Sequence, residues 1–309
     1  MNTPLIVALP GNEGLAQPLA CAVAGELAPM DIRQFPDGET YLRYQSASLA
    51  DRPVVILCTL DHPDQKVLPL IFAASTARDL GAGSVGIVCP YLGYMRQDQR
   101  FEPREAITSV HFARLLSGTF DWLITVDPHL HRHSSLSEIY SMPAVALQAA
   151  PLIANWIREQ VERPLLLGPD SESEQWVANV ARSAGAPYVI LNKIRHGDRT
   201  VEVSIPEIER WHAHTPVLVD DIVSTARTMI ETLRHLARIR SKPAVCIAVH
   251  GIFAGRAYQE LREAGASRVV TANTVPHETN SLDVTNLLAG AIRDTIRTVA
   301  QPETVRGQN

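Results

Sequence analysis

Short runs of valine, isoleucine and leucine that alternate with helix-like stretches constrain the fold of this chain more than any other feature. The runs show little polar alternation, which is typical of strands covered on both faces. Glycines at 81, 185 and 265 stand where helix C-termini need a left-handed residue. This order predicts βαβ units with mainly parallel sheets. The predicted strands are Leu5–Leu9, Val54–Leu60, Val85–Cys89, Trp122–Val126, Leu165–Leu167, Tyr188–Leu191, Val217–Val219, Val245–Val249 and Val269–Val270. The predicted helices are Leu15–Leu27, Val67–Leu80, Ser109–Leu116, Gln175–Ala184, Thr228–Ile239 and Arg256–Ala264.

The alternation of strands and helices occurs once in each half of the chain. A chain of 309 residues exceeds what one hydrophobic core usually organises. One strand-to-helix junction in each half carries polar chemistry, at Asp127 to His129 and at Asp220-Asp221. No identical repeat is visible, so the doubling rests on element order. We expect two domains, 1–143 and 144–309.

The charge balance excludes some partners. With 28 basic and 33 acidic side chains the net charge is -5, which argues against a broad basic surface for nucleic acid or an anionic membrane. No run approaches the roughly 18 unbroken apolar residues of a spanning helix, and the N-terminus lacks the cationic start of a signal peptide. The four cysteines form no Cys-x-x-Cys pair. We expect a cytoplasmic protein with no nucleic-acid or membrane partner.

The segment from Val217 to Thr228 is the most informative one. A predicted strand ends in Asp220 and Asp221, and a hydroxyl-containing loop leads into a helix near Thr228. Carboxyl ends of parallel strands face the ligand crevice. There, carboxylates can accept hydrogen bonds from sugar hydroxyls, while loop N–H groups and a helix start can hold phosphate. Alternatively, the two acids only cap the helix. The predicted ribose 5-phosphate ligands are Asp220, Asp221, Ser224, Thr225, Ala226, Arg227 and Thr228.

A second candidate region follows the predicted strand that ends at Cys89. It concentrates the guanidinium groups of Arg96, Arg100 and Arg104 in a stretch without helical periodicity. Such a loop suits a polyphosphate, because arginine offers fixed bidentate donors. The alternative is a solvated loop in which Glu102 and Glu105 pair with the arginines.

Two shorter motifs each allow two interpretations. Asp170 lies between a predicted strand and a helix that begins near Glu174, so it is either a ligand of a hard cation or an N-cap. Lys193 and Arg195 follow the predicted strand Tyr188–Leu191 two residues apart. They either meet the same polyanion or lie in a basic hairpin without a ligand.

Histidines alternate at positions 129, 131 and 133, which would place all three on one face of an extended segment. That spacing raises the alternative of a three-histidine metal site. No carboxylate within the run completes a ligand set, and Pro128 and Arg132 favour a loop.

Several segments together resemble the ribose-phosphate pyrophosphokinase (phosphoribosyl pyrophosphate synthetase) family, in order and over nearly the whole chain. The 217–228 segment is also similar to the type I phosphoribosyltransferases, but a simple phosphoribosyltransferase would match only the second half. The matching segments are Phe35 to Thr40, Pro90 to Asp98, Asp127 to His129, Gly168 to Asp170, Lys193 to Arg195, His250 to Phe253 and Asn273 to Pro276.

The resemblance implies two tandem type I phosphoribosyltransferase-like domains, each a mainly parallel sheet flanked by helices. It implies transfer of the β,γ-diphosphoryl group of ATP to C1 of ribose 5-phosphate, with Lys193 and Arg195 on a catalytic arm. It implies Mg2+ at His129 and Asp170. It also implies a homo-oligomer, because the Phe35 to Glu39 segment reaches the nucleotide of a neighbouring subunit. The implied ATP-binding residues are Phe35, Asp37, Glu39, Arg96, Gln97, Asp98, Arg100 and Arg104.

The chain departs from the family pattern at the ribose and diphosphate pocket. Ser224 replaces a third acid, and Arg227 replaces a glycine, which would cost roughly 1–3 kcal/mol if the backbone there needs positive φ. Glu172 and Glu174 add charge beside Asp170, and the loop 130–137 does not match, so that His131 and His133 are expected on a loop surface. Two rivals follow: a silent nucleotide-binding homologue that regulates an active synthetase, and a diphosphokinase with another sugar phosphate or nucleotide.

Overall fold

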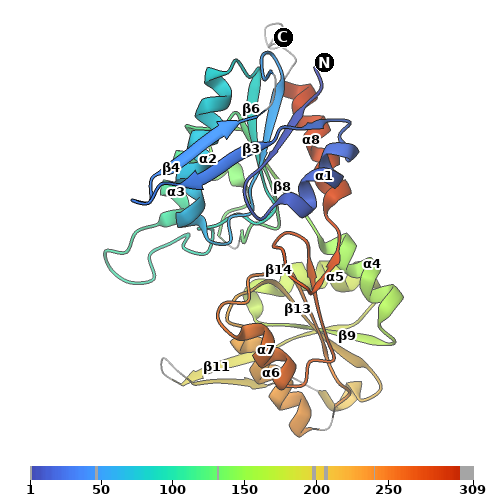
Figure 1. Ribbon diagram of the computed structural model, residues 1–309. Helices are drawn as coiled ribbons and strands as arrows, with labels where there is room; N and C mark the ends of the chain where they lie inside the picture. The colour runs from blue at the N-terminus through green and yellow to red at the C-terminus, as the bar shows by residue number, and fades with distance from the viewer. Residues whose placement is uncertain are drawn as a thin grey trace, which may run out of the picture. The chain divides into compact units, whose positions relative to one another are not determined.

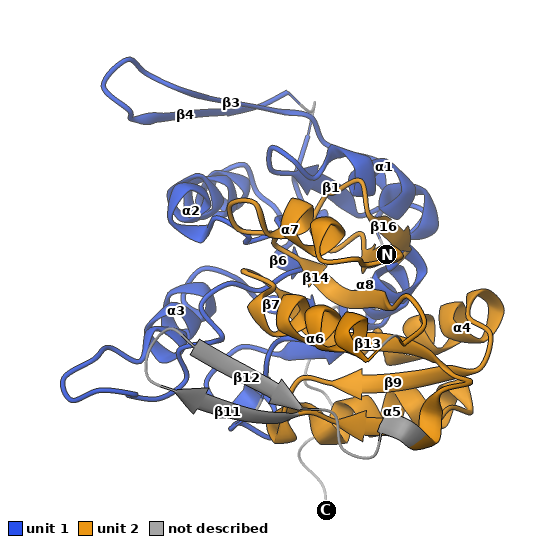
Figure 2. Ribbon diagram, turned by 90° about the horizontal axis from the view of Figure 1, so that it is seen from below, with its two compact units in different colours: residues 1–147, 284–309 blue, residues 148–283 orange. Residues whose placement is uncertain are grey.

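The chain forms two compact units, Met1–Leu147 with Val284–Asn309 and Gln148–Asp283 (Figure 2). This computed structural model describes residues 2–45, 48–130, 132–196, 200–204, 208–239 and 241–299. For the described residues among 192–209 it gives the backbone alone.

Unit 1 is built on a six-stranded parallel sheet of order β2-β1-β5-β6-β7-β8. Helices α1 and α8 lie on one face of the sheet, and α2 and α3 lie on the other (Figure 1). An antiparallel hairpin, β3–β4, extends from the unit (Figure 2). The strands are β1 Leu5–Ala8, β2 Glu26–Leu27, β3 Met30–Gln34, β4 Thr40–Tyr44, β5 Pro53–Leu57, β6 Ser84–Cys89, β7 Trp122–Val126 and β8 Ala144–Leu147. The helices are α1 Glu13–Ala22, α2 Pro63–Asp79, α3 Thr108–Ser117, the short 3-10 turn η1 Leu136–Glu138, and α8 Thr285–Val299.

Unit 2 repeats this plan with the order β10-β9-β13-β14-β15-β16, again all parallel. Helices α4 and α5 pack together on one face of this sheet, and α6 and α7 pack together on the other face (Figure 1). The strands are β9 Pro164–Gly168, β10 Tyr188–Ile190, β11 Asn192–His196, β12 Thr200–Ser204, β13 Thr215–Val223, β14 Val245–Gly251, β15 Arg268–Ala272 and β16 Asn280–Leu282. The helices are α4 Ala150–Gln160, α5 Glu174–Ala184, α6 Arg227–Arg238 and α7 Ala257–Glu263, with 3-10 turns η2 Ser171–Ser173 and η3 Ile208–Trp211.

The predicted α/β class with parallel, helix-flanked sheets is confirmed. All five residues of β7 and all seven of β14 are buried, as expected for strands covered on both faces. The left-handed glycines also fall where they were expected, with Gly185 at φ +68° as the C-cap of α5.

The C-terminal helix belongs to the first unit. Helix α8 packs against α1, β7 and β8, and the Arg293 side chain donates a 2.6 Å hydrogen bond to the Ala22 carbonyl. Its buried face, which includes Leu288 and Ile292, covers the sheet of unit 1. The chain therefore returns to unit 1 after 283, whereas the expected domain 144–309 keeps these residues in the second half.

Three cysteines, Cys58, Cys89 and Cys246, are buried and unpaired, and Cys21 is exposed on α1. Across the part of the chain that the structure describes, no helix combines the length and apolarity needed to cross a bilayer.

Candidate functional site

The two aspartates of the ribose-phosphate motif lie inside β13 rather than after it. The strand continues to Val223, and its register places Asp220 opposite Ala248 and Ile222 opposite His250 of β14. Both aspartates are half-buried. The strand pairing therefore fixes the backbone that carries these aspartates near the carboxyl end of a central strand.

The loop that follows turns through a left-handed residue, Ala226, at φ +58°. Arg227 is the first residue of α6, so the positive φ that would have been costly at Arg227 is taken by the residue before it. Ala226 is the N-cap residue of α6, and its methyl side chain cannot accept a hydrogen bond from the amides of the first turn. Thr225 is exposed beside this turn and Thr228 is half-buried within it. The start of α6 presents its dipole to an anion.

The loop after β14 holds the turn between β13 and α6, residues 224–226, in place. The amides of Ile252 and Phe253 donate to the Val223 carbonyl at 2.9 and 3.1 Å, and the amide of Ala254 donates to the Ser224 carbonyl at 3.0 Å. Sequence reasoning assigned this loop only a resemblance to the family. Its physical role is to fix the backbone between Asp221 and α6.

Charge is crowded around Asp220. Burial, then the adjacent Asp221 charge and a hydrogen bond with that side chain, and finally the Asp170 charge, raise the pKa of Asp220 well above its usual range. Only the amide of Asp221, which donates to Asp220 Oδ1 at 3.0 Å, opposes this shift. A ligand that brings hydroxyl donors or positive charge would relieve the crowding.

Asp170 acts as an N-cap, which was the alternative interpretation of this residue. Its Oδ1 accepts a 3.2 Å hydrogen bond from the Ser173 amide, and the Ser173 hydroxyl donates to the Asp170 carbonyl at 2.7 Å. The cap fixes the side chain close enough to Asp220 to influence its pKa. Helix α5 then begins at Glu174 as predicted, and both Glu172 and Glu174 are exposed.

The arginine-rich loop after β6 is irregular, as its sequence indicated. Arg96, Arg100 and Arg104 are exposed. The Glu105 carboxylate accepts hydrogen bonds from the amides of Phe101 and Glu102 at 2.9 and 3.0 Å, so it braces the backbone. Arg100 Nε donates to the Glu105 carbonyl at 2.9 Å.

Gln97 and Asp98 in the same loop have intramolecular partners. The Thr108 hydroxyl donates to Gln97 Oε1 at 3.3 Å. Asp98 is buried and receives Arg132 Nη1 at 3.0 Å on Oδ1 and at 3.2 Å on Oδ2. The sequence did not predict this partner of Asp98. Its one visible sign was the position of Arg132 as a single arginine among histidines.

The turn of the β3–β4 hairpin carries Phe35, Asp37 and Glu39, all exposed. The Phe35 amide donates to the Glu39 carbonyl at 2.8 Å, and Gly38 takes φ +90°. The Arg33 guanidinium lies 4.8 Å from the centre of the Phe35 ring, a cation–π contact that orients the ring.

His129 follows β7 and is half-buried, whereas His131 lies outside the described residues. His133 Nδ1 lies 2.9 Å from Glu138 Oε2, and the Ser134 hydroxyl donates to Glu138 Oε1 at 2.6 Å. Hydrogen bonds from Ser134, then from His133, lower the pKa of Glu138 to about 2. His133 is thus held by a carboxylate, and no trio of His, Cys, Asp or Glu side chains among the described residues is arranged as a metal site.

Lys193 and Arg195 lie in β11, opposite Val203 and Val201 of β12. Their side chains lie outside the described residues, so their proposed contacts with a polyanion stay a prediction.

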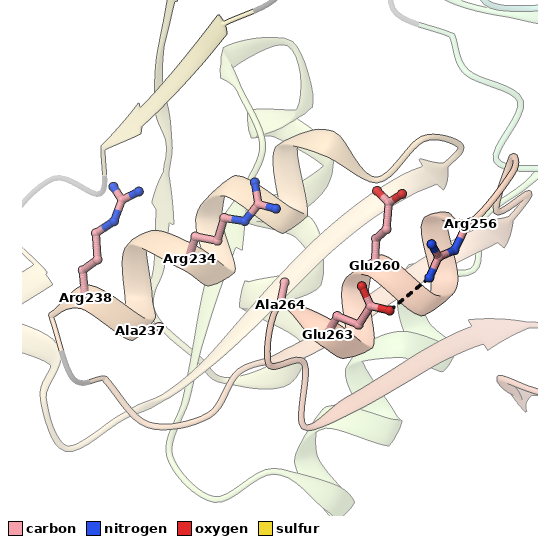
Figure 3. A pocket seen from close by; sticks show the side chains of 7 residues that line it. All are labelled: Arg234, Ala237, Arg238, Arg256, Glu260, Glu263 and Ala264. Carbon is pink, nitrogen blue, oxygen red and sulfur yellow. Dashed lines mark hydrogen bonds and ion pairs between the residues drawn. The ribbon is translucent and has the colours of Figure 1, made fainter.

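A surface groove of about 670 Å3 lies between α6 and α7 (Figure 3). Within it Arg256 Nη2 pairs with Glu263 Oε1 at 3.2 Å. It is lined by Arg234, Ala237, Arg238, Arg256, Glu260, Glu263 and Ala264, none of which is a predicted site residue.

Comparison with known proteins covers both units. Residues 5–119 match the N-terminal domain of ribose phosphate pyrophosphokinase, and residues 135–285 match the phosphoribosyl transferase domain. A ribose-phosphate pyrophosphokinase of Saccharolobus solfataricus is 32% identical over 88% of this chain and 93% of its own length. One of Methanopyrus kandleri is 31% identical over 94% of this chain and 99% of its own.

The fold has a solved counterpart as well. The crystal structure of phosphoribosylpyrophosphate synthetase from Mycobacterium smegmatis superposes with a TM-score of 0.83, at 23% identity, over 96% of this chain and 100% of that chain. Sequence relatives and the two matched domains agree with this fold. The chain belongs to the ribose-phosphate pyrophosphokinase family.

Proposed function

We propose that the chain is a ribose-phosphate diphosphokinase, which transfers the β,γ-diphosphoryl group of ATP to the C1 hydroxyl of ribose 5-phosphate. The products are phosphoribosyl pyrophosphate and AMP. The observation that carries the proposal is the crowded carboxylate pair Asp220-Asp221 near the end of β13. A short turn joins this strand to the start of α6, where the N-cap residue Ala226 has no side chain that could cap the helix. Relatives that match nearly the whole chain bear the name of this activity.

Each half of ribose 5-phosphate has a counterpart in this motif. Asp220 and Asp221 would accept hydrogen bonds from the ribose hydroxyls. The amides and hydroxyls from Ser224 to Thr228 would surround the 5-phosphate, with the dipole of α6 behind them. Arg227, exposed at the first position of α6, adds a positive charge at this end.

The triphosphate requires cations from other segments. The exposed guanidinium groups of Arg96, Arg100 and Arg104 suit the ATP phosphates, with Gln97 and the Phe35 to Glu39 turn on the nucleoside side. Lys193 and Arg195 would stabilise the group in transfer, where positioning and charge neutralisation supply most of the catalysis. The hairpin turn acts from a neighbouring subunit in this proposal, so the enzyme is a homo-oligomer.

A divalent cation suits the chemistry of Asp170, because a carboxylate is a hard oxygen donor. The charges of Asp221 and Asp170 raise the pKa of Asp220 beyond the effect of burial, so a nearby cation would also relieve that repulsion. We propose Mg2+ as the cofactor, with His129 and Asp170 as the ligands that the family resemblance implies. When bound, Mg2+ neutralises charge on the diphosphoryl group.

The deciding experiment measures AMP release from ATP and Mg2+ with and without ribose 5-phosphate, and identifies the sugar product by mass. Sugar-dependent AMP together with phosphoribosyl pyrophosphate is the expected result. If the folded protein binds ATP but releases no AMP with any pentose phosphate, it is a silent homologue and the proposal fails. AMP release with another sugar or nucleotide only would redefine the substrate.

Buried, unpaired cysteines suit a reducing compartment, and we propose a cytoplasmic enzyme.

A further inference from the structure

We infer that the Asp98–Arg132 ion pair couples the arginine-rich loop to the loop that carries His129, and that Asp98 is a positioning residue rather than an ATP ligand. The arginine-rich loop is defined as residues 94–108, and the histidine loop as the described residues 127–130 and 132–138. The inference rests on the proposed function for the identity of the bound nucleotide. It adds a positioning element that joins two parts of the proposed nucleotide and metal site.

The environment of Asp98 is that of a structural carboxylate. Its side chain is 2% exposed, and both of its oxygens lie within hydrogen-bond distance of Arg132 Nη1, at 3.0 and 3.2 Å. A carboxylate at this depth, already paired with a guanidinium, is poorly suited to an ATP phosphate, which carries the same charge. Its neighbours Arg96 and Gln97 remain accessible to a nucleotide.

Arg132 is also fixed at its other side. Its guanidinium lies 5.6 Å from the centre of the Phe101 ring, so it contacts the arginine-rich loop at two positions. The arginine itself is one-third exposed, whereas its partner is almost fully buried. The pair therefore bridges residues 34 positions apart in the sequence.

Each loop is internally braced, so a displacement at the ion pair would move more than one side chain. In the arginine-rich loop, the Gln97 carbonyl accepts from the Ser109 amide at 3.3 Å at the start of α3. In the histidine loop, Glu138 holds His133 and Ser134. Because the Asp98–Arg132 pair, with its buried carboxylate, joins these two braced segments, we expect a change in one loop to alter the arrangement of the other.

The test is a double-mutant cycle with Asp98→Asn, Arg132→Gln and both together. Asparagine preserves the volume of Asp98, so the fold should survive, and thermal unfolding checks this. Each single variant should raise the KM for ATP about tenfold and leave the KM for ribose 5-phosphate unchanged. The double variant should be no worse than either single one, because both remove the same interaction. Arg114→Gln, an exposed charge on α3, is the matched control.

Hydrogen exchange supplies a readout that does not depend on turnover. Asp98→Asn should accelerate exchange of amides 132–138, and Arg132→Gln should accelerate exchange of amides 96–104, each about tenfold. Fold-changes in KM that multiply in the double variant, or a loss of ATP binding in Asp98→Asn alone, would overturn the inference. If the wild-type protein shows no sugar-dependent AMP release, the proposed function fails. Reciprocal exchange effects would still support the coupling, and their absence would overturn it.

Discussion

Each unit has a parallel sheet of the same plan, yet the carboxylates at the ends of two equivalent central strands have different partners. Strand β5 in unit 1 and β13 in unit 2 occupy equivalent positions in the two sheet orders. After β5, the Asp61 carboxylate pairs with the Lys66 ammonium, which also donates a 2.8 Å hydrogen bond to the Thr59 carbonyl. In β13, Asp220 faces the carboxylates of Asp221 and Asp170 instead.

The pKa directions follow from these partners. Burial alone would raise the pKa of Asp61, but the hydrogen bond and charge of Lys66, helped by His62, lower it on balance. For Asp220, burial and the neighbouring acids act in the same direction and raise it. Asn12 completes the arrangement in unit 1, because its Oδ1 accepts from the Thr59 amide at 2.8 Å. The strand end of unit 1 is satisfied by its own side chains, whereas that of unit 2 gains from a ligand.

The two hairpins extend the comparison. In unit 1 the β3–β4 hairpin lies in sequence between β2 and β5, and in unit 2 the β11–β12 hairpin lies between β10 and β13.

We expect the largest effect of a substitution at the second hairpin, β11–β12. Lys193→Ala should lower kcat by about 10²–10³-fold with little change in ATP affinity, because Lys193 stabilises the group in transfer. Asp37→Ala, in the turn of the first hairpin, should instead raise the KM for ATP. Kinetics with calorimetric ATP binding checks both, and unchanged turnover in Lys193→Ala would remove the arm from the mechanism.

The strand ends should differ in the same way. Asp221→Ala should raise the KM for ribose 5-phosphate about tenfold to hundredfold, the effect of losing a hydrogen bond to a charged group. Asp61→Ala is the matched change in unit 1 and should leave this KM unchanged. Steady-state kinetics in ribose 5-phosphate measures both variants. Equal KM increases would mean that the two strand ends act alike and that the comparison is wrong.

Removing the internal cation of unit 1 should cost stability rather than activity. Lys66→Met leaves the half-buried Asp61 without its ammonium partner and should lower the free energy of unfolding by about 1–2 kcal/mol at pH 7. Because the folded pKa of Asp61 is lowered, this loss should be present at neutral pH and should disappear as the pH falls below about 4. Denaturant titration across pH measures it. Pairing Lys66→Met with Asp61→Asn should recover most of the loss, and a double variant as unstable as the single one would contradict the role of the pair.

The sequence predicted the central strands well because their apolar runs are buried on both faces, as in β7. It shortened β13, since Asp220 and Asp221 interrupt the apolar pattern while continuing the ladder to β14. It missed β3, whose residues are mostly exposed, and α4, which has Pro151 in its first turn.

Residues of the candidate site could be nominated from the sequence, and their roles stay predictions, whereas their contacts could not be read from it. The acids of β13 and the left-handed turn are local features, and local features leave a pattern. The Asp98–Arg132 pair joins positions 34 apart, and nothing in either neighbourhood identifies the partner. The N-cap role of Asp170 and its influence on Asp220 also coexist, although they had been separate alternatives.

Relieving the charge at Asp220 should stabilise the ligand-free protein. Asp220→Asn removes one of three crowded carboxylates and should raise the free energy of unfolding by about 1 kcal/mol at pH 7. The folded pKa of Asp220 is raised, so the wild-type protein loses stability as the pH rises from about 4 toward that pKa. The gain in Asp220→Asn should therefore vanish in acid. Denaturant titration at both pH values measures this, with turnover expected to fall. A variant that is less stable at neutral pH would show that the charge at Asp220 is compensated within the ligand-free protein.

The smallest predicted effect concerns the turn between β13 and α6, and it tests which of its residues has a strained backbone. Ala226 takes φ +58°, a conformation that costs a residue with a Cβ about 1 kcal/mol, whereas Arg227 is helical. Ala226→Gly relieves that cost but adds freedom to the unfolded chain, so a net gain of about 0.5 kcal/mol is expected. Arg227→Gly should lose about 0.5 kcal/mol, because glycine is a poor helix residue. Thermal unfolding should separate the two variants by a few degrees, about 2–4 °C per kcal/mol. The reverse order of stability would put the left-handed residue at position 227, where the family pattern has its glycine, and would make Arg227 the strained residue of the site.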